Sequence, residues 1–336
     1  MTLDHEDFGL IPGEPFEPPL AGEGPFDLSQ PHVMTVAGPI PPEALGVCQH
    51  HEHVICNPTA VACDDSDWVL DDPHASLAEL EAYHVAGGRA MLDASTADYG
   101  RDATTMAWIA ARSPVHLILV TGHHKALYCA SHIEGKTVDQ IAAVSIRELR
   151  EGIDESRVKP GAVKAGSSFD EIQPCEEIAL RAAARTHLAT GAPITTHTEA
   201  GTMALEQLAL FDSEGVDLSR VIIGHLDRKL EEPYLRAVLA TGAYASFDQI
   251  SKVYYGPDEP KAAMIRTLVD AGYEDQLLVS QDLARKTLLS AYGGGPGWVY
   301  LLERFTLSLM AAGITAGVVR KLLVDNPARA LTVRPA

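Results

Sequence analysis

The chain has 336 residues, of which 46% are apolar, and its mean hydropathy is close to zero. Its formal net charge of −20 argues against nucleic acid as a partner, because neutralising phosphates takes clustered lysine and arginine. The same charge disfavours an anionic membrane surface, and no stretch approaches the ~18 consecutive apolar residues of a membrane span. The N-terminus lacks a basic region followed by an apolar segment, and the five cysteines form no CxxC pair. We therefore expect a cytoplasmic protein without a disulfide framework that acts on a small molecule.

Residues 1–31 differ in composition from the rest of the chain. They hold six prolines and seven acidic residues but no lysine or arginine, which is typical of a flexible, self-repelling segment. We interpret residues 1–31 as an irregular acidic N-terminal arm and residues 32–336 as a single domain.

Short apolar runs alternate with longer amphipathic ones along that domain. The apolar runs are typical of strands covered on both faces, and they occupy residues 46–53, 89–95, 116–121, 161–165, 193–198, 221–225, 243–247 and 276–282. The clearest helical patterns, 137–151 and 175–190, end at Gly152 and Gly191. Further helical patterns cover 201–214, 231–240, 258–271 and 298–324. Eight strands alternating with helices, without an internal linker, predict an α/β fold with one (β/α)8 TIM barrel.

Polar side chains stand at the predicted strand ends, where the chemistry of such a barrel lies. They are His51, His53, Lys164, His197, His225 and Asp282. Alternation places His51 and His53 on one face of their strand, so both imidazoles can point into the barrel mouth. His50 and Glu52, like Cys48, have the opposite parity and are expected on the outer face, with Cys48 in a buried apolar role. Each histidine alone is as consistent with a structural role, but the set favours divalent metal ions.

Lys164 is the unusual member of this set, because metal ions would repel an ammonium group. Burial and nearby cations both lower the pKa of a lysine, which leaves a neutral amine that can react with carbon dioxide. We hypothesise that Lys164 is carboxylated (N6-carboxylysine), since a carbamate has two anionic oxygens suited to bridging two metals. The alternative is a Lys164 paired with an aspartate or glutamate at the barrel mouth.

The complete set resembles the amidohydrolase superfamily and, within it, the phosphotriesterase-like family. Supporting strings are Thr-Val-Ala-Gly-Pro-Ile (35–40) before His-His-Glu-His (50–53), Tyr-Gly-Arg-Asp (99–102), Thr-Thr-His-Thr (195–198), Ile-Gly-His-Leu-Asp-Arg (223–228) and Asn-Pro-Ala-Arg-Ala-Leu (326–331). The resemblance runs from about residue 32 to the C-terminus.

The resemblance implies a binuclear metal centre. His51, His53 and Asp282 would hold the more buried ion and His197 and His225 the outer one, while carboxylated Lys164 and a hydroxide would bridge both. Two cations lower the pKa of a shared water and polarise the electrophile's oxygen, and Asp282 would act as the catalytic proton acceptor. Zn²⁺ is the first choice of metal, with Mn²⁺, Co²⁺ or Fe²⁺ as alternatives. A homodimer is also implied.

Three strings are most similar to the sugar-lactone branch of the family, which includes relatives that act on phosphorylated sugar lactones. They are His-Leu-Asp-Arg (225–228), Ser-Phe-Asp-Gln-Ile-Ser-Lys-Val-Tyr-Tyr (246–255) and Gln-Asp-Leu-Ala-Arg-Lys (281–286). Arg228, Lys252 and Arg285 follow the last three strands, and we predict that they bind a phosphate or carboxylate of the substrate. The alternative is that Arg228 and Arg285 pair with local carboxylates such as Asp227 and Asp248.

Other candidate contacts lie in the loops after the strands. His123 and His124 follow the third strand, and we expect one of them to contact a substrate hydroxyl. Tyr254 and Tyr255 are candidates for substrate binding, with ordinary packing as an equal alternative. The glycine-rich segment 293–297 is interpreted either as a mobile segment that closes over the pocket or as a turn.

The leading hypothesis is a binuclear metal-dependent hydrolase that opens a small lactone, sugar-derived and possibly anionic. The second is a hydrolase with the same site whose better substrate is a phosphotriester or another carboxylic ester. The third is a non-catalytic binding protein on a barrel scaffold, which the complete ligand set disfavours.

Overall fold

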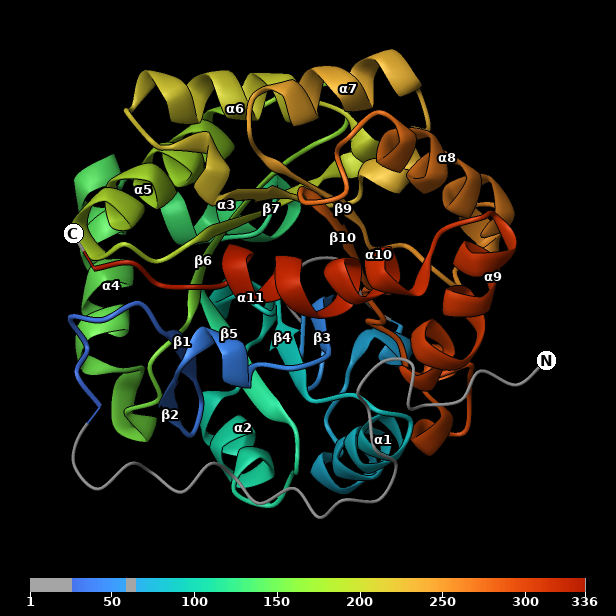
Figure 1. Cartoon of the computed structure of the whole chain (residues 1–336). Helices are drawn as coiled ribbons and strands as arrows, with labels where there is room; N and C mark the ends of the chain where they lie inside the picture. Colours follow the sequence, from blue (N-terminus) through green and yellow to red (C-terminus); the bar gives the residue numbers. More distant parts are fainter. Residues whose placement is uncertain (1–25, 59–64, 336) are drawn as a thin grey trace.

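The computed structural model describes residues 26–58 and 65–335, and all eight predicted strands are present in it. They are β3 (Cys48–Glu52), β4 (Ala90–Asp93), β5 (His116–Gly122), β6 (Ala162–Ser167), β7 (Ile194–Thr198), β8 (Val221–Ile223), β9 (Tyr244–Phe247) and β10 (Leu277–Val279). They pair in parallel, each with the next in chain order. The predicted (β/α)8 barrel is confirmed (Figure 1).

The two ends of this sheet, β3 and β10, meet at a seam that polar groups hold together. The His51 amide donates to Ser280 Oγ at 3.2 Å, and the Asp282 amide donates to the His51 carbonyl at 3.1 Å. Glu52 accepts from Ser280 Oγ at 2.7 Å and from the amides of Gln281, Asp282 and Leu283 at 2.7–3.1 Å. One buried carboxylate therefore ties together segments that lie about 230 residues apart.

Helices surround the barrel (Figure 1). They are α1 (Pro73–Val85), α2 (Ala103–Ala110), α3 (Ala126–Ile133), α4 (Val138–Glu151), α5 (Pro174–Thr190), α6 (Ala204–Ser213), α7 (Glu232–Ala240), α8 (Glu259–Asp270), α9 (Thr306–Ala311), α10 (Ala316–Arg320) and α11 (Asn326–Ala330). A capping box at Thr137 begins α4 and Gly152 ends it. The helix predicted over 298–324 is wrong as one element, because Gly313 at φ +88° separates α9 from α10.

A β-bulge in β3 corrects the predicted side-chain directions. Gln49 pairs with Met91 and Glu52 with Asp93, so β3 has one residue more than β4 between these pairs. Cys48 therefore packs inside the barrel, in one apolar cluster with Leu92 and Val120. His50 also points inward, with Nε2 2.6 Å from Ser246 Oγ. The outward parity predicted for Cys48 and His50 is wrong because alternation fails at a bulge, whereas the buried apolar role of Cys48 is confirmed.

The amino end of the barrel is closed by a short hairpin that the sequence patterns did not predict. Strands β1 (Val33–Thr35) and β2 (Gly38–Ile40) pair antiparallel, and Val33 and Ile40 join the apolar cluster of the barrel interior. His32 bridges to Val333, which links the beginning and the end of the barrel domain. Most of the predicted acidic arm, residues 1–25, lies outside the described residues.

None of the helices in 26–58 and 65–335 is long and apolar enough to cross a membrane. Within the same ranges Cys48, Cys56, Cys129 and Cys175 are free thiols.

The seam predicts the effect of Glu52→Ala. The substitution leaves the buried amides of Gln281 and Leu283 without an acceptor, whereas the Asp282 amide and the Ser280 hydroxyl keep the His51 carbonyl. A lost buried partner costs about 1–3 kcal/mol each. We expect the free energy of unfolding to fall by at least ~2 kcal/mol in urea denaturation. Glu81→Ala, on the exposed face of α1, is the control and should have almost no effect. A loss below ~1 kcal/mol for Glu52→Ala would contradict this account of the seam.

Candidate metal centre

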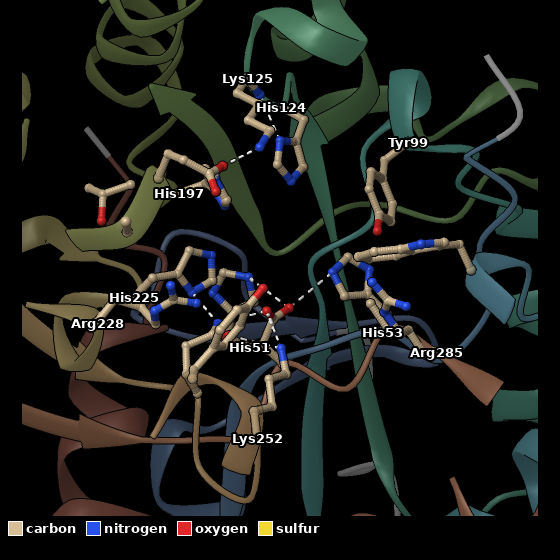
Figure 2. A pocket seen from close by; sticks show the side chains of 18 of the residues that line it. His51, His53, Tyr99, His124, Lys125, His197, His225, Arg228, Lys252 and Arg285 are labelled. Atoms are coloured by element: carbon tan, nitrogen blue, oxygen red, sulfur yellow. Dashed lines mark hydrogen bonds and ion pairs between the residues drawn. The ribbon is translucent and has the colours of Figure 1, made fainter. Parts of the chain in front are cut away.

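A cavity of about 360 Å³ opens at the carboxyl ends of the strands, and all six predicted ligands line it. Figure 2 shows His51, His53, His197 and His225 gathered around one space, although they come from three different strand ends. The closed barrel brings these side chains together because it places every strand end at one rim.

His51, His53 and Asp282 form the first group of possible metal ligands. One nitrogen or oxygen from each lies within 4.8 Å of the others. Asp282 Oδ1 is 3.3 Å from His53 Nε2 and 3.8 Å from His51 Nε2. These atoms face a common volume across the β3–β10 seam.

His197 and His225 lie beside this group. Their ring centroids are 4.5 Å apart, and the His225 ring is 4.8 Å from that of His51. His225 follows β8 in a left-handed backbone conformation at φ +62°, which is uncommon for a residue other than glycine and clusters at functional sites. The outer pair thus adjoins the inner group through His51.

Asp248, which was considered in the sequence only as a possible arginine partner, lies beneath two of the histidines. Its Oδ1 accepts from the His225 amide at 2.9 Å and lies 2.7 Å from His225 Nδ1. Its Oδ2 is 3.3 Å from His51 Nδ1 and accepts from Ser246 Oγ at 2.6 Å. With both Nδ1 atoms facing this carboxylate, the Nε2 atoms of His51 and His225 remain for a metal ion.

Burial sets the protonation of the histidines. It lowers the pKa of both His51 and His197 to about 3, and it lowers the pKa of His53 as well. Burial also disfavours the charged form of His225, but Asp248 outweighs it and raises the pKa of this imidazole. A more basic imidazole is a better metal ligand, and neutral imidazole is the form that binds metals.

Asp282 is ionised at neutral pH. Burial opposes its charge, but Lys252 and His53 outweigh burial and hold the pKa of Asp282 well below its usual range. Lys252 Nζ lies 2.7 Å from Asp282 Oδ2, and Gln249 Nε2 donates to the same oxygen at 2.7 Å. Oδ1 therefore faces the histidines while Oδ2 faces a lysine and an amide.

Lys164 lies on the floor of the cavity with 1% of its surface exposed. Its Nζ donates to the Ala94 carbonyl at 2.9 Å and is 3.5 Å from His51 Nε2. Burial lowers the pKa of Lys164 to about 8. In the described part of the chain this amine makes no ion pair with a carboxylate, so the alternative of a simple Lys–Asp or Lys–Glu pair lacks its partner.

The donor set fits divalent metal ions. Neutral imidazoles and an ionised carboxylate are their preferred ligands, and here they converge on one cavity with their remote atoms held by the protein. The group His51, His225 and Asp248 also has ligand atoms within 4.8 Å. We assign Asp248 to orienting these two histidines rather than to the metal, because it faces their Nδ1 atoms from behind.

The predicted anion-binding residues line the same cavity. The Arg228 guanidinium lies 3.3 Å from the centre of the Tyr255 ring and, within the described residues, makes no ion pair. Arg285 lies 3.9 Å from the Trp68 ring centre, with Asp67 at 3.7 Å. Neither arginine pairs with Asp227 or Asp248 within the described residues, but Arg285 does pair with other carboxylates, Asp67 and Asp65 at 3.7 and 4.0 Å, so the alternative holds in part for Arg285.

Three of the four loop residues predicted to contact substrate line the cavity, and one does not. His124, Tyr254 and Tyr255 line the cavity, with the two tyrosines half exposed. His123 does not line it: its Nδ1 is 3.7 Å from Asp98 Oδ2, so we drop it as a substrate contact.

The glycine-rich segment is a hydrogen-bonded turn. The amides of Gly295 and Gly297 donate to carbonyls of residues 287 and 288. Glu79 accepts from the Ala291 and Trp298 amides on either side. These contacts favour the turn over a segment that closes across the pocket.

Several cavity residues were not singled out from the sequence. They are Trp68, Tyr99, Gln249 and Glu199, and Lys125 was noted only in passing; Asp248 lies behind the cavity wall, against His51 and His225. Asp248 and Glu199 each lie within two residues of a strand end, which is the signal that would have identified them.

The fold and this donor set define a (β/α)8 barrel with side chains at its rim that are able to hold metal ions. The model of the phosphotriesterase family matches residues 31–331, and the chain belongs to that family. It is 34% identical to the phosphotriesterase homology protein of Escherichia coli, over 85% of this chain and 98% of that protein. It is 31% identical to a phospho-furanose lactonase of Mycoplasmopsis synoviae, over 88% of this chain and 90% of the relative.

A solved structure is also similar. The crystal structure of a lactonase from Listeria monocytogenes superposes with a TM-score of 0.87 at 36% identity, covering 90% of this chain and 99% of the other. This agreement extends over the whole barrel and supports the family assignment made from the sequence strings.

The position of Asp248 predicts the effect of Asp248→Asn. An asparagine has the size of an aspartate, but it has only one acceptor oxygen, and the two imidazoles need one each. We expect the affinity for divalent metal to fall at least ~10-fold, measured by competition with a coloured chelator. Asp270→Asn, on the exposed end of α8, is the matched control. Unchanged metal affinity in Asp248→Asn would rule out its orienting role.

Proposed function

We propose that the chain is a binuclear metal-dependent hydrolase that opens a small anionic lactone derived from a sugar. The single observation that carries this proposal is the convergence of four histidines, a lysine and an aspartate on one cavity below Arg228, which makes no ion pair with any residue of 26–58 and 65–335. The names of the similar proteins support it, since one is a phospho-furanose lactonase and another a lactonase.

The proposed ligands divide into two groups. His51, His53 and Asp282 would hold the inner ion and His197 and His225 the outer one, with carboxylated Lys164 between them. When bound, two divalent ions would polarise the lactone carbonyl and lower the pKa of a water molecule toward neutrality. Zn²⁺ remains the proposed metal and a homodimer the proposed assembly.

Asp282 supplies the proton transfer in this proposal. Its Oδ1 faces the histidines, and its Oδ2 is held by Lys252 and Gln249. We assign Oδ2 as the acceptor of the proton that the attacking water loses, and as the donor of that proton to the leaving alkoxide oxygen. Lys252 and Gln249 would keep the carboxylate in place during both transfers.

The cavity mouth favours an anionic substrate. In the part of the chain that the structure describes, Arg228 is held by Tyr255 and by no carboxylate, so its donors are available for a phosphate or carboxylate of the substrate. Arg285 contributes positive charge from the opposite side of the mouth (Figure 2), although Asp67 partly neutralises it. Lys252 forms an ion pair with Asp282, so it would attract the anionic group of the substrate mainly through its positive charge.

A proton-release assay on the metal-loaded protein tests the proposed reaction. The panel contains phosphorylated sugar lactones, the same lactones without phosphate, and a phosphotriester. We expect the highest kcat/KM for a phosphorylated lactone, and loss of turnover on chelation with recovery on adding divalent metal. Turnover of the phosphotriester with every lactone inert would establish the second hypothesis in place of the first.

Arg228→Ala tests the anion site. A lost charge-assisted hydrogen bond is worth about 1.5–3 kcal/mol, so kcat/KM for phosphorylated lactones should fall about 10- to 150-fold. Lactones without phosphate should lose much less. Arg266→Ala, an exposed arginine on α8, serves as the control. Equal losses for both kinds of lactone would contradict a role in binding the anion.

A further inference from the structure

The protein contacts His197 through Nε2 of the ring, whereas it contacts the other three histidines of the site through Nδ1. His53 Nδ1 is 2.7 Å from Ser95 Oγ, and the Nδ1 atoms of His51 and His225 face Asp248. In His197 it is Nε2 that is engaged, 3.1 Å from Glu199 Oε2. A neutral imidazole has one protonated nitrogen and one lone pair, so the atom that donates to the protein decides which atom faces a metal.

Glu199 is placed for this contact by its neighbours. Lys125, which precedes α3, binds the same carboxylate oxygen, and Figure 2 shows Lys125 and His197 on one side of the cavity. The Thr202 hydroxyl donates to the Glu199 carbonyl at 2.8 Å, and the next residue, Ala200, has a left-handed conformation at φ +53°. Non-glycine residues in that conformation persist where the surrounding structure holds them.

The surroundings of the His197 ring also support a role for Glu199 at this histidine. The His124 ring lies 4.5 Å from it on one side and the His225 ring 4.5 Å on the other. Among the described residues that line the cavity, Glu199 and Asp282 are the carboxylates. Asp282 faces the inner group, so Glu199 is the carboxylate that serves the outer pair.

We propose that Glu199, held by Lys125, is a positioning residue for the outer metal site: it accepts the Nε2 proton of His197 and leaves Nδ1 to bind the ion. Lys125 keeps the carboxylate against the imidazole, so that Glu199 acts through His197 and is not a ligand itself. The proposal rests on the binuclear centre proposed above. It makes the loops after β5 and β7 jointly responsible for one of the two metals.

Stepwise titration of the full-length protein with Co²⁺ tests the proposal, with affinities from chelator competition and coordination from the visible spectrum. Removing a group that orients a metal-binding histidine costs about 10- to 100-fold in metal affinity. We therefore expect Glu199→Ala to weaken one of two bound ions by that factor and to leave the other within ~3-fold of the unmodified protein. Glu199→Gln keeps an acceptor oxygen and should restore most of the affinity.

The control is Glu171→Ala, an exposed carboxylate at the same end of the barrel, which should change neither affinity. Two unchanged affinities in Glu199→Ala would reduce Glu199 to a surface ion pair and overturn the proposal. A Co²⁺ spectrum that changes as much in Glu199→Gln as in Glu199→Ala would make Glu199 a direct ligand and also overturn it.

A second measurement does not depend on the variants folding. Long-range ¹H–¹⁵N NMR of the Zn²⁺-loaded protein identifies which nitrogen of each histidine keeps its proton. We expect His197 alone among the four to be metal-bound at Nδ1, and a metal at its Nε2 would overturn the proposal. A protein that binds two ions in this way but opens no lactone would refute the proposed substrate and leave the role of Glu199 intact.

Discussion

The seam between β3 and β10 is the contact on which the cavity depends. His51 and His53 stand near the beginning of the domain and Asp282 near its end, so these side chains can meet only if the two edges of the sheet join. Few strand residues are available for the joining, since β10 has only three. Glu52 supplies the missing contacts by accepting from the backbone just beyond β10. A buried carboxylate with several donors can replace a regular ladder because each backbone amide finds an acceptor.

The electrostatics of the cavity follow from burial together with a few fixed partners. Neutral histidines, an ionised aspartate and a lysine with a lowered pKa are held side by side, and such a combination is typical of functional sites. On a chain with a net charge of −20, the mouth instead presents Arg228 and Arg285 on aromatic rings. The Tyr255 ring fixes the Arg228 guanidinium without neutralising it, whereas Arg285 is partly neutralised by Asp67. An anionic substrate requires charge that remains available, so Arg228 is the main anion-binding group.

The alternation of apolar and amphipathic runs was sufficient to predict all eight strands, because barrel strands buried on both faces have few polar residues. The alternation of side-chain direction along a strand gave the wrong face for Cys48 and His50, because a bulge in β3 adds one residue and reverses the parity. The pattern of runs also missed the hairpin of β1 and β2, whose three-residue strands are too short to show a period. Helix 298–324 was predicted as continuous although Gly313 was visible within it.

The six candidate ligands could be identified because they stand at the ends of five predicted strands, with His51 and His53 sharing one, whereas their partners could not. Asp248 and Glu199 matter through the atoms that they face, the Nδ1 atoms of His51 and His225 and the Nε2 atom of His197. Such relations depend on side-chain directions, which spacing along the chain does not specify. The same holds for the bond between Lys125 and Glu199, which joins loops after two different strands.

The central claim is that one barrel rim holds two metal ions between six side chains. A crystal structure of the metal-loaded protein, with anomalous diffraction at the metal's absorption edge, tests it most directly. We expect two anomalous peaks, one among His51, His53 and Asp282 and one beside His197 and His225, with carbamate density on Lys164 between them. A single peak, or an unmodified Lys164 amine between two ions, would contradict the claim.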